Sequence, residues 1–321
     1  MSKVEILVAE PMRESLVVGL ERVFAVHRLW ETADAAGLLG RVGDRIRGLV
    51  RFRHPVDSAL LRRLPKLEIV GNFGVGYDGI DLGACVDSNI VVTNTPGVLN
   101  DETADTAIGL LLMTVRELSS AERYLRAGRW ARDGNYPLTR GTLRDRTVGI
   151  VGLGRIGLAV ARRLDAMNVP VVYHNRRPRT DVAYPYYGSL LAMAEAVDTL
   201  MVVLPGTPST NGLIDASVLA AIGANGVLVN IGRGFVVDMD SLVDALSGRT
   251  ILAAGLDVYP KEPHVPEALL SLDNVVLLPH VGSASIYTQD AMAALVVDNL
   301  RSWFEEGRPL TPVAETPWPP A

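Results

Sequence analysis

Short apolar runs alternate with stretches of helical periodicity along the chain. A first series covers residues 4–8, 46–50, 67–70 and 90–93, and a second covers residues 148–151, 171–174, 200–204, 227–231, 251–256 and 275–278. Short runs rich in Val, Ile and Leu, separated by helices, are typical of parallel strands that are buried on both faces. The pattern therefore predicts an α/β protein of two lobes, each with a parallel sheet covered by helices.

A long helix is expected between the two series. It should begin near Asn100 and Asp101, which are favourable N-cap residues, and run to about Arg126. Its middle, residues 108–113, is apolar on nearly all sides, so the helix must be buried between layers or against a second subunit. We therefore predict a homodimer whose contact runs through this helix, residues 101–126.

The last helix, about residues 287–304, is expected to return to the first lobe. That lobe is then discontinuous in sequence. The predicted domains are residues 1–98 together with 288–321, and residues 99–287.

The turn after the first strand of the second series carries the spacing Gly152, Gly154, Gly157. Glycines at this spacing allow a tight turn, close approach of a pyrophosphate to the backbone, and close packing of helix on strand. The helix that begins at Arg155 and Ile156 would present unpaired N–H groups and the positive end of its dipole to the phosphates. The second lobe is therefore predicted to bind a dinucleotide on a doubly wound parallel sheet.

The next strand of this series ends in Asn175, Arg176 and Arg177. At this position an NAD site usually carries an acid that binds the ribose 2′-hydroxyl, whereas arginines suit a 2′-phosphate. We therefore predict NADP(H) as the cofactor. The alternative interpretation is that these arginines, with Arg179, form a solvated turn.

Composition narrows the class of protein. The 321 residues include 31 Lys and Arg against 36 Asp and Glu, a formal net charge of -5, so no basic surface indicates a nucleic acid or an anionic membrane as partner. No apolar run approaches the ~18 residues that span a bilayer, and no signal peptide is recognisable. The single cysteine, Cys85, excludes an intrachain disulfide and a cysteine-based metal cluster. We expect a cytoplasmic protein without a metal.

Polar residues follow the strands of the second series at the edge where those strands end. Ligands of open parallel sheets bind at this edge. Arg233 offers a rigid fork for a carboxylate and can polarise a neighbouring carbonyl. His280 can exchange a proton near neutral pH, and a carboxylate such as Glu262 on its other nitrogen would fix the tautomer and favour the protonated form. The set fits reduction of a 2-oxo acid.

Seven ordered motifs, which together span nearly the whole chain, resemble the D-isomer-specific 2-hydroxyacid dehydrogenase family. They are Asn-Phe-Gly-Val-Gly-Tyr-Asp-Gly-Ile-Asp at residues 72–81, Asn-Thr-Pro-Gly at 94–97, Gly-Leu-Gly-Arg-Ile-Gly at 152–157, Val-Asn-Ile-Gly-Arg-Gly at 229–234, Gly-Leu-Asp-Val at 255–258, Glu-Pro at 262–263 and Leu-Pro-His at 278–280. Within the family, the chain looks most like the NADPH-dependent glyoxylate/hydroxypyruvate reductases, whose relatives also reduce hydroxyphenylpyruvate or 2-ketogluconate. The resemblance implies two Rossmann-like lobes, a flavodoxin-like substrate domain and an inserted dinucleotide-binding domain.

The resemblance also implies roles for individual residues. Arg233 is the expected substrate binder, His280 the acid/base and Glu262 its orienting partner, and these three form the catalytic set. The backbone amides of Val75 and Gly76 would meet the substrate carboxylate. The expected cofactor contacts are Thr106, Gly152, Gly154, Arg155, Ile156, Gly157, Asn175, Arg176, Arg177, Leu204, Pro205, Thr210, Ile231, Arg233, Asp257, His280 and Gly282.

Several candidate residues have an alternative interpretation. The loop at Val75 and Gly76 could be an anion-binding nest or a turn needed only for packing. Asp257 could meet the nicotinamide amide or act as an ordinary turn or cap. Phe52 could border the substrate or lie in a solvent-facing loop. Trp130 could enter the pocket of a partner subunit or pack in the core.

The sequence thus predicts an NADPH-dependent reductase that converts a small 2-oxo acid, such as glyoxylate or hydroxypyruvate, to the D-2-hydroxy acid in a cleft between the lobes. One alternative is a reductase for bulkier acids of the 2-ketogluconate or phenylpyruvate type. A second is a non-enzymatic, nucleotide-sensing corepressor, which the absence of long disordered tails disfavours. A third is phosphoglycerate or formate dehydrogenase activity, against which Arg176 and Arg177 argue.

Overall fold

The structure, a computed structural model, describes residues 3–316 and residue 318. Contacts within the chain divide it into two units, each with its own sheet. Unit 1 extends to Leu99 and resumes at Ser285, and unit 2 is Asn100–Ala284. No helix among the described residues is long and apolar enough to cross a membrane.

The sheet of unit 1 has five parallel strands in the order β2-β1-β3-β4-β5. The strands are β1 (Glu5–Val8), β2 (Ala25–Arg28), β3 (Ile46–Arg51), β4 (Ile69–Asn72) and β5 (Val91–Thr93). This order, with helices on both faces, is the flavodoxin-like arrangement. Phe52 follows the end of β3 and the loop containing Val75 follows the end of β4, so both lie at the carboxyl edge of the sheet.

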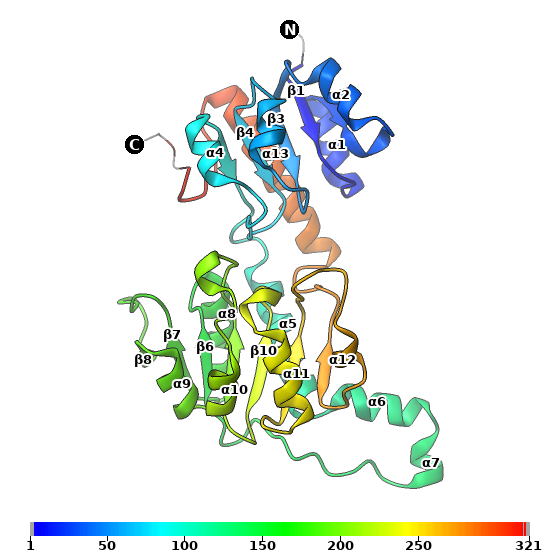
Figure 1. Ribbon diagram of the computed structural model, residues 1–321, viewed down its shortest axis with the longest axis vertical. Helices are drawn as coiled ribbons and strands as arrows, with labels where there is room; N and C mark the ends of the chain where they lie inside the picture. The colour runs from blue at the N-terminus through cyan, green and yellow to red at the C-terminus, as the bar shows by residue number, and fades with distance from the viewer. Residues whose placement is uncertain (1–2, 317, 319–321) are drawn as a thin grey trace. The chain divides into compact units, whose positions relative to one another are not determined.

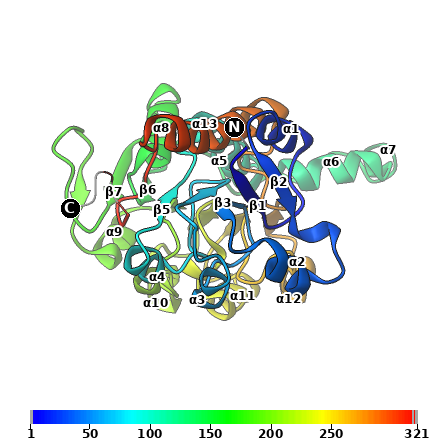
Figure 2. The same cartoon turned by 90° about the horizontal axis from the view of Figure 1, so that it is seen from above.

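Helices cover both faces of this sheet (Figure 2). On one face lie α1 (Glu14–Val23) and α13 (Ile286–Glu306), and on the other α2 (Ala35–Val42), α3 (Ser58–Arg62) and α4 (Leu82–Asp87), with a short 3-10 turn η1 (Leu29–Glu31) before α2. Gly71 of β4 has no side chain, and Val296 and Leu300 of α13 pack directly on it. The helix expected near the end of the chain is therefore part of unit 1.

The sheet of unit 2 has seven parallel strands in the order β12-β11-β10-β9-β6-β7-β8. They are β6 (Val148–Val151), β7 (Val171–His174), β8 (Tyr186–Tyr187), β9 (Thr199–Val202), β10 (Val227–Asn230), β11 (Ala253–Leu256) and β12 (Val275–Leu277). Counted from β6, the first six strands follow the Rossmann order 3-2-1-4-5-6, and the seventh extends the sheet.

Two layers of helices bury this second sheet. α5 (Asn100–Val115) and α8 (Arg155–Ala166) share a core with the strands on one face. On the other face lie α9 (Leu190–Ala196), α10 (Ala216–Ala221) and α11 (Met239–Ser247), and the remaining short elements are α12 (Glu267–Leu270), η2 (Pro208–Thr210) and η3 (Gly234–Val236). Strands buried on both faces explain the continuous apolar runs of the sequence.

The expected fold class is confirmed, because both sheets are parallel and covered by helices on both faces. Two strands, β2 and β8, were not among the expected runs. All four residues of β2 are only half-buried, and β8 has two residues, so neither contains the buried apolar run by which the other strands were recognised.

The single helix expected over residues 101–126 is wrong. α5 ends at Val115, and α6 (Leu118–Arg126) begins after Glu117, whose φ of 52° is left-handed. α5 packs against α8 and against the strands β10 to β12. One side of α5 is therefore buried within its own unit, whereas Ile108, Leu112 and Met113 on the helix stay half-buried, and the predicted subunit contact stays a prediction.

An arm, residues 118–138, extends from the rest of unit 2 and contains α6 and α7 (Arg129–Asp133) (Figures 1 and 2). Core packing of Trp130 is excluded, because the side chain is 60% exposed and its indole N–H donates to Asn135 at 3.2 Å. Other large apolar side chains exposed on the arm are Leu118, Leu125 and Leu138.

Candidate active site

The fingerprint turn joins β6 to α8 and is shaped by its three glycines. Gly152 has a φ of 103°, a conformation that residues with a side chain rarely adopt. A Cβ at Gly157 would lie 2.4 Å from the carbonyl oxygen of Gly152, so glycine is required for α8 to start this close to the strand. A Cβ at Gly154 would meet no atom within 4 Å. The turn thus leaves open space beside Gly154, where a phosphate can approach the backbone.

The first turn of α8 is suited to bind an anion. Gly154 is the N-cap and, having no side chain, does not cap the helix. The N–H groups of Arg155 and Ile156 have no acceptor within the helix, because the first N–H groups of any α-helix lack one. These donors and the positive end of the helix dipole fit a pyrophosphate.

Beyond β7, Asn175 supports the fingerprint turn, because its Oδ1 accepts a hydrogen bond from the Leu153 N–H at 2.7 Å. Arg179 is also engaged, since it donates to the Leu153 carbonyl at 3.0 Å and pairs with Asp181. Its guanidinium lowers the pKa of the Asp181 carboxyl.

Arg176 and Arg177 differ from Arg179. Both are exposed, and among the described residues neither side chain forms a hydrogen bond or an ion pair. Two cations at the end of β7 are therefore not committed to other groups of the part of the chain that the structure describes.

His280 and Glu262 form a hydrogen-bonded pair. The Nδ1 atom of His280 lies 2.7 Å from Oε2 of Glu262, and the other carboxylate oxygen accepts the backbone N–H of Tyr259 at 3.1 Å. The backbone of His280 has a φ of 54°, a left-handed conformation that is costly for a residue with a side chain and that the surrounding contacts must hold. Burial raises the pKa of the Tyr259 phenol to about 12, and its hydroxyl donates to the carbonyl of Leu278 at 2.9 Å.

Asp257 anchors the backbone that follows His280. It is buried, and its two carboxylate oxygens accept the N–H groups of Val281 and Gly282 at 2.8 and 2.9 Å. Burial raises the pKa of the Asp257 carboxyl, although the two backbone hydrogen bonds act in the opposite direction. Asp257 therefore holds the loop in place, and its contact with a nicotinamide stays a prediction.

The turn that carries Arg233 is fixed by a fully buried asparagine. Oδ1 of Asn230 accepts the N–H of Gly232 at 3.0 Å, and its Nδ2 donates to the carbonyl of Arg233 at 3.0 Å. The Arg233 guanidinium itself donates to the carbonyl of Gly232 at 2.9 Å. Both ends of the turn are thus held by one side chain.

The sheet brings these groups to one edge. Arg233 follows β10, Asp257 follows β11 and His280 follows β12, and these three strands are neighbours in the sheet. Thr106 of α5 reaches the same loop, with its hydroxyl 3.4 Å from the carbonyl of Gly282. A base or acid, its carboxylate partner and a guanidinium therefore lie at the carboxyl edge of unit 2.

The other expected cofactor residues follow β9 and β10. Thr210 donates its hydroxyl to the carbonyl of Pro205 at 3.1 Å and takes part in a capping box with Thr207. Leu204 follows β9, and Ile231 is buried directly after β10. Their contacts with a cofactor stay predictions.

In unit 1, Glu10 orders the loop after β3. A single carboxylate oxygen, Oε1, accepts the backbone N–H groups of Phe52, Arg53 and His54 at 2.8, 2.7 and 2.6 Å. The Phe52 ring is 38% exposed and packs edge-on against Phe73. Phe52 therefore sits on an ordered loop with part of its ring exposed, and its role beside a substrate stays a prediction.

The loop of Val75 and Gly76 directs its amides outward. Among the described residues, none accepts a hydrogen bond from the N–H of Val75 or of Gly76. The carbonyls of this loop are instead bonded to two asparagine side chains, those of Asn72 and Asn94. The geometry fits an anion-binding nest, which stays the prediction for this loop.

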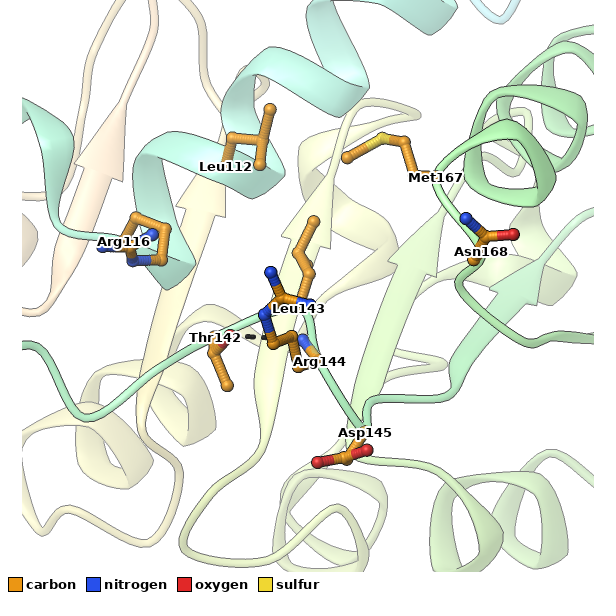
Figure 3. Close-up of a pocket in the computed structure, with 8 residues that line it drawn as sticks. All are labelled: Leu112, Arg116, Thr142, Leu143, Arg144, Asp145, Met167 and Asn168. Atoms are coloured by element: carbon orange, nitrogen blue, oxygen red, sulfur yellow. Dashed lines mark hydrogen bonds between the residues drawn. The ribbon is translucent and has the colours of Figure 1, made fainter.

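A separate hollow of about 460 Å³ lies at the opposite edge of unit 2 (Figure 3). It is lined by Leu112, Arg116, Thr142, Leu143, Arg144, Asp145, Met167 and Asn168. These residues lie at the C-terminal ends of α5 and α8 and in the segment before β6, where the strands begin. Because ligands of such sheets bind where the strands end, this hollow is not part of the candidate site.

Some residues that shape the site were not among the sequence candidates. They are Glu10, Asn72, Asn94, Asn230 and Tyr259. All act through hydrogen bonds to backbone groups. The only sequence signal is a polar residue at or just after the end of a buried strand, which Asn72, Asn94 and Asn230 share.

Comparison with protein families gives a match over residues 108–282. This segment matches the family described as D-isomer specific 2-hydroxyacid dehydrogenase, NAD binding domain. The matched residues include the fingerprint turn, Arg233, Glu262 and His280.

Whole proteins are also similar to this chain. The glyoxylate/hydroxypyruvate reductase A of Arabidopsis thaliana is 45% identical over 98% of this chain and 100% of that protein. The hydroxyphenylpyruvate reductase of Plectranthus scutellarioides is 44% identical over 98% of this chain and 100% of its own length. The crystal structure of an NADPH-dependent glyoxylate/hydroxypyruvate reductase from Sinorhizobium meliloti, in complex with NADP and malonate, shows 52% identity and a TM-score of 0.95, with 98% of each chain covered.

Proposed function

The chain belongs to the D-isomer-specific 2-hydroxyacid dehydrogenase family, and from this premise we propose that it reduces a small 2-oxo acid, such as glyoxylate or hydroxypyruvate, to the D-2-hydroxy acid with NADPH. The observation that carries the proposal is the His280–Glu262 pair, at the same sheet edge as Arg233. A histidine held by a carboxylate at one nitrogen can transfer a proton at the other.

The residues of this chain divide the work of a carbonyl reduction. Bound NADPH supplies a hydride to the carbonyl carbon. Nε2 of His280 gives a proton to the carbonyl oxygen, and Glu262 holds the ring through Nδ1. The Arg233 guanidinium binds the carboxylate and polarises the carbonyl beside it. Its positive charge stabilises the negative charge that develops on the carbonyl oxygen. The amides of Val75 and Gly76 receive the substrate carboxylate.

The described residues fit NADP(H) better than NAD(H). The space beside Gly154 and the uncapped start of α8 suit the pyrophosphate. Arg176 and Arg177 supply two cations where a 2′-phosphate would bind, and the neutral Asn175 stands where an NAD site usually has an acid. The solved relative with NADP bound supports the same assignment.

The proposal predicts a specific pattern of turnover. Purified protein should consume NADPH with glyoxylate or hydroxypyruvate, and NADH at the same sub-saturating concentration should be consumed far more slowly. The oxidation is followed by loss of absorbance of the reduced cofactor. No consumption with any 2-oxo acid, by protein that still binds NADPH, would instead favour the nucleotide-sensing alternative.

A second candidate is reduction of bulkier 2-oxo acids. The similarity to a hydroxyphenylpyruvate reductase favours it, and so does the partly exposed ring of Phe52. Phenylpyruvate and 2-ketogluconate belong in the same assay, and a higher kcat/KM for either one would make that acid class the substrate class.

We also propose that the protein is a cytoplasmic homodimer and that the arm, which shares residues 118–126 with the contact predicted from the sequence, takes part in it. The arm exposes Leu118, Leu125, Trp130 and Leu138, and apolar side chains gathered on one projecting segment are typical of protein interfaces.

The proposed cytoplasmic location rests on the cysteine content. A single buried cysteine is consistent with a reducing compartment.

The dimer proposal has a direct test. The double variant Leu125→Asp/Trp130→Glu should be monomeric by size-exclusion chromatography with light scattering. Burying two unpaired carboxylates at an apolar contact has a large unfavourable free energy. The wild type should show twice the chain mass of 34.5 kDa. The control variant Leu191→Glu changes an exposed leucine of α9 and should remain dimeric. A monomeric wild type would contradict the proposal.

A further inference from the structure

The loop of residues 74–76 is held by its carbonyl oxygens. Nδ2 of Asn72 donates to the carbonyls of Gly74 and Gly76, at 2.9 and 3.0 Å. Nδ2 of Asn94 donates to the carbonyl of Val75, at 2.9 Å. Two asparagine side chains therefore bind three successive carbonyls of one loop.

This arrangement determines where the amides of the loop point. In a trans peptide, the N–H of one residue points away from the carbonyl of the residue before it. The carbonyls of Gly74 and Val75 face the asparagines, so the N–H groups of Val75 and Gly76 face away from them. The same holds for the N–H of Tyr77, which follows the carbonyl of Gly76. The asparagines thus turn several donors outward, away from the interior of unit 1.

The orientation of the Asn72 amide is set by a buried cation. Arg51 is only 3% exposed, and its guanidinium donates to Oδ1 of Asn72 at 2.6 Å. A guanidinium can only donate, so the oxygen of the amide must face Arg51 and its NH₂ group must face the two loop carbonyls. Arg51 also donates through Nε to the carbonyl of His54 at 2.8 Å, which connects the loop after β3 with the loop after β4.

Asn94 is fixed by the C-terminal segment of unit 1. Its backbone carbonyl accepts the hydroxyl of Thr311 at 2.6 Å, and its N–H donates to the Thr311 carbonyl at 3.3 Å. Thr311 is bonded in turn to the fully buried Asn299 of α13 through two hydrogen bonds of 2.9 Å. Asn72 is therefore supported at its side chain and Asn94 at its backbone, in both cases by residues outside the loop.

We propose that Asn72 and Asn94 are positioning residues that hold the amides of Val75 and Gly76 in the orientation that receives the carboxylate of the 2-oxo acid. The inference rests on the proposed function and concerns its substrate site. Neither asparagine contacts the substrate carboxylate in this account. Each acts through the peptide groups that do, by fixing donors before the substrate arrives.

The test uses two variants of the full-length protein, with glyoxylate as substrate. Asn94→Ala removes the donor to Val75 without adding a charge. Asn72→Asp keeps an acceptor for Arg51 but cannot donate to either loop carbonyl. Each should raise the KM for glyoxylate about tenfold or more, equivalent to losing one hydrogen bond to a charged group. The kcat and the KM for NADPH should stay near the wild-type values, because ground state and transition state share the carboxylate contact.

A matched control separates positioning from loss of stability. Asn274 in unit 2 also bridges two carbonyls, those of Leu246 and Leu252, at 3.2 Å each. Asn274→Ala should lower the Tm and leave the KM for glyoxylate unchanged.

The outcomes distinguish this inference from the proposed function. If the wild type reduces glyoxylate, and Asn72→Asp and Asn94→Ala have the wild-type KM for glyoxylate, the positioning role is overturned while the proposed function stands. A fall in kcat at constant KM would also overturn it. A wild type that reduces none of the 2-oxo acids would overturn the proposed function and this inference with it.

Discussion

Replacing His280 with alanine should lower kcat by about 100- to 10,000-fold, the range that a lost general acid produces. The imidazole is the titratable group that this edge of unit 2 holds by a carboxylate, with Glu262 at 2.7 Å from Nδ1. Without it, the carbonyl oxygen must take its proton from water while the hydride arrives. NADPH binding should change little, because the phosphates and the adenosine end bind elsewhere in unit 2.

Two further variants make this prediction specific. His264→Ala removes an exposed histidine two residues after Glu262 and should retain the wild-type kcat. Glu262→Gln keeps the size of the side chain but removes its charge, so kcat should fall to a value between wild type and His280→Ala. The measurements are steady-state kinetics and the Kd for NADPH from fluorescence titration. Wild-type turnover by His280→Ala would refute its assignment as the proton donor.

The sequence was sufficient to predict the layers of the fold because its strands are buried on both faces. Strands such as β6 and β10 are fully buried, and their residues are mostly apolar. β2 and β8 lie at the sheet edges, where one side of the strand is exposed and this signal is lost. The other two edge strands, β5 and β12, keep short runs of Val and Leu and were predicted, so β2 and β8 were missed because they lack such a run.

The break between α5 and α6 also could not be predicted. It contains neither glycine nor proline, and the residue in the left-handed conformation is Glu117. Such a conformation costs about 1–2 kcal/mol in a residue with a side chain, so contacts made elsewhere must stabilise it. Two are visible: Tyr136 donates its hydroxyl to the Glu117 carboxylate at 3.0 Å, and Gly141 packs against the carbonyl of Val115. Both come from segments distant in sequence, which a local pattern does not reveal.

Some residues of the candidate site could be predicted from the sequence, and others could not. Residues with distinctive chemistry, such as Arg233 and His280, could be recognised from their place after a strand. The asparagines that orient backbone groups could not, because an asparagine after a strand is common in ordinary turns. What distinguishes Asn72 is its burial and its contact with Arg51, and both depend on the packing of β3 beside β4. Positioning residues therefore become visible only when the tertiary contacts are known.

The double variant Arg176→Ala/Arg177→Ala should lower kcat/KM for NADPH by about 100-fold or more and leave kcat/KM for NADH nearly unchanged. A hydrogen bond to a charged group contributes about 1.5–3 kcal/mol, and two arginines on one phosphate contribute at least two such bonds. NADH lacks the 2′-phosphate, so its binding does not depend on these hydrogen bonds. The measurement is steady-state kinetics with each cofactor below saturation, at fixed ionic strength, because salt screens exposed charges.

An independent change should shift the preference in the same direction. Asn175→Asp keeps the oxygen that accepts the Leu153 N–H, so the fingerprint turn should stay in place. It adds a negative charge that repels a 2′-phosphate and can accept a hydrogen bond from a 2′-hydroxyl. kcat/KM should therefore fall with NADPH and rise with NADH. The control Arg162→Ala removes an exposed arginine of α8 and should leave kcat/KM unchanged with either cofactor.

One outcome would contradict the phosphate-binding role of Arg176 and Arg177. If their double variant loses kcat/KM equally with NADPH and NADH, these arginines do not recognise the 2′-phosphate.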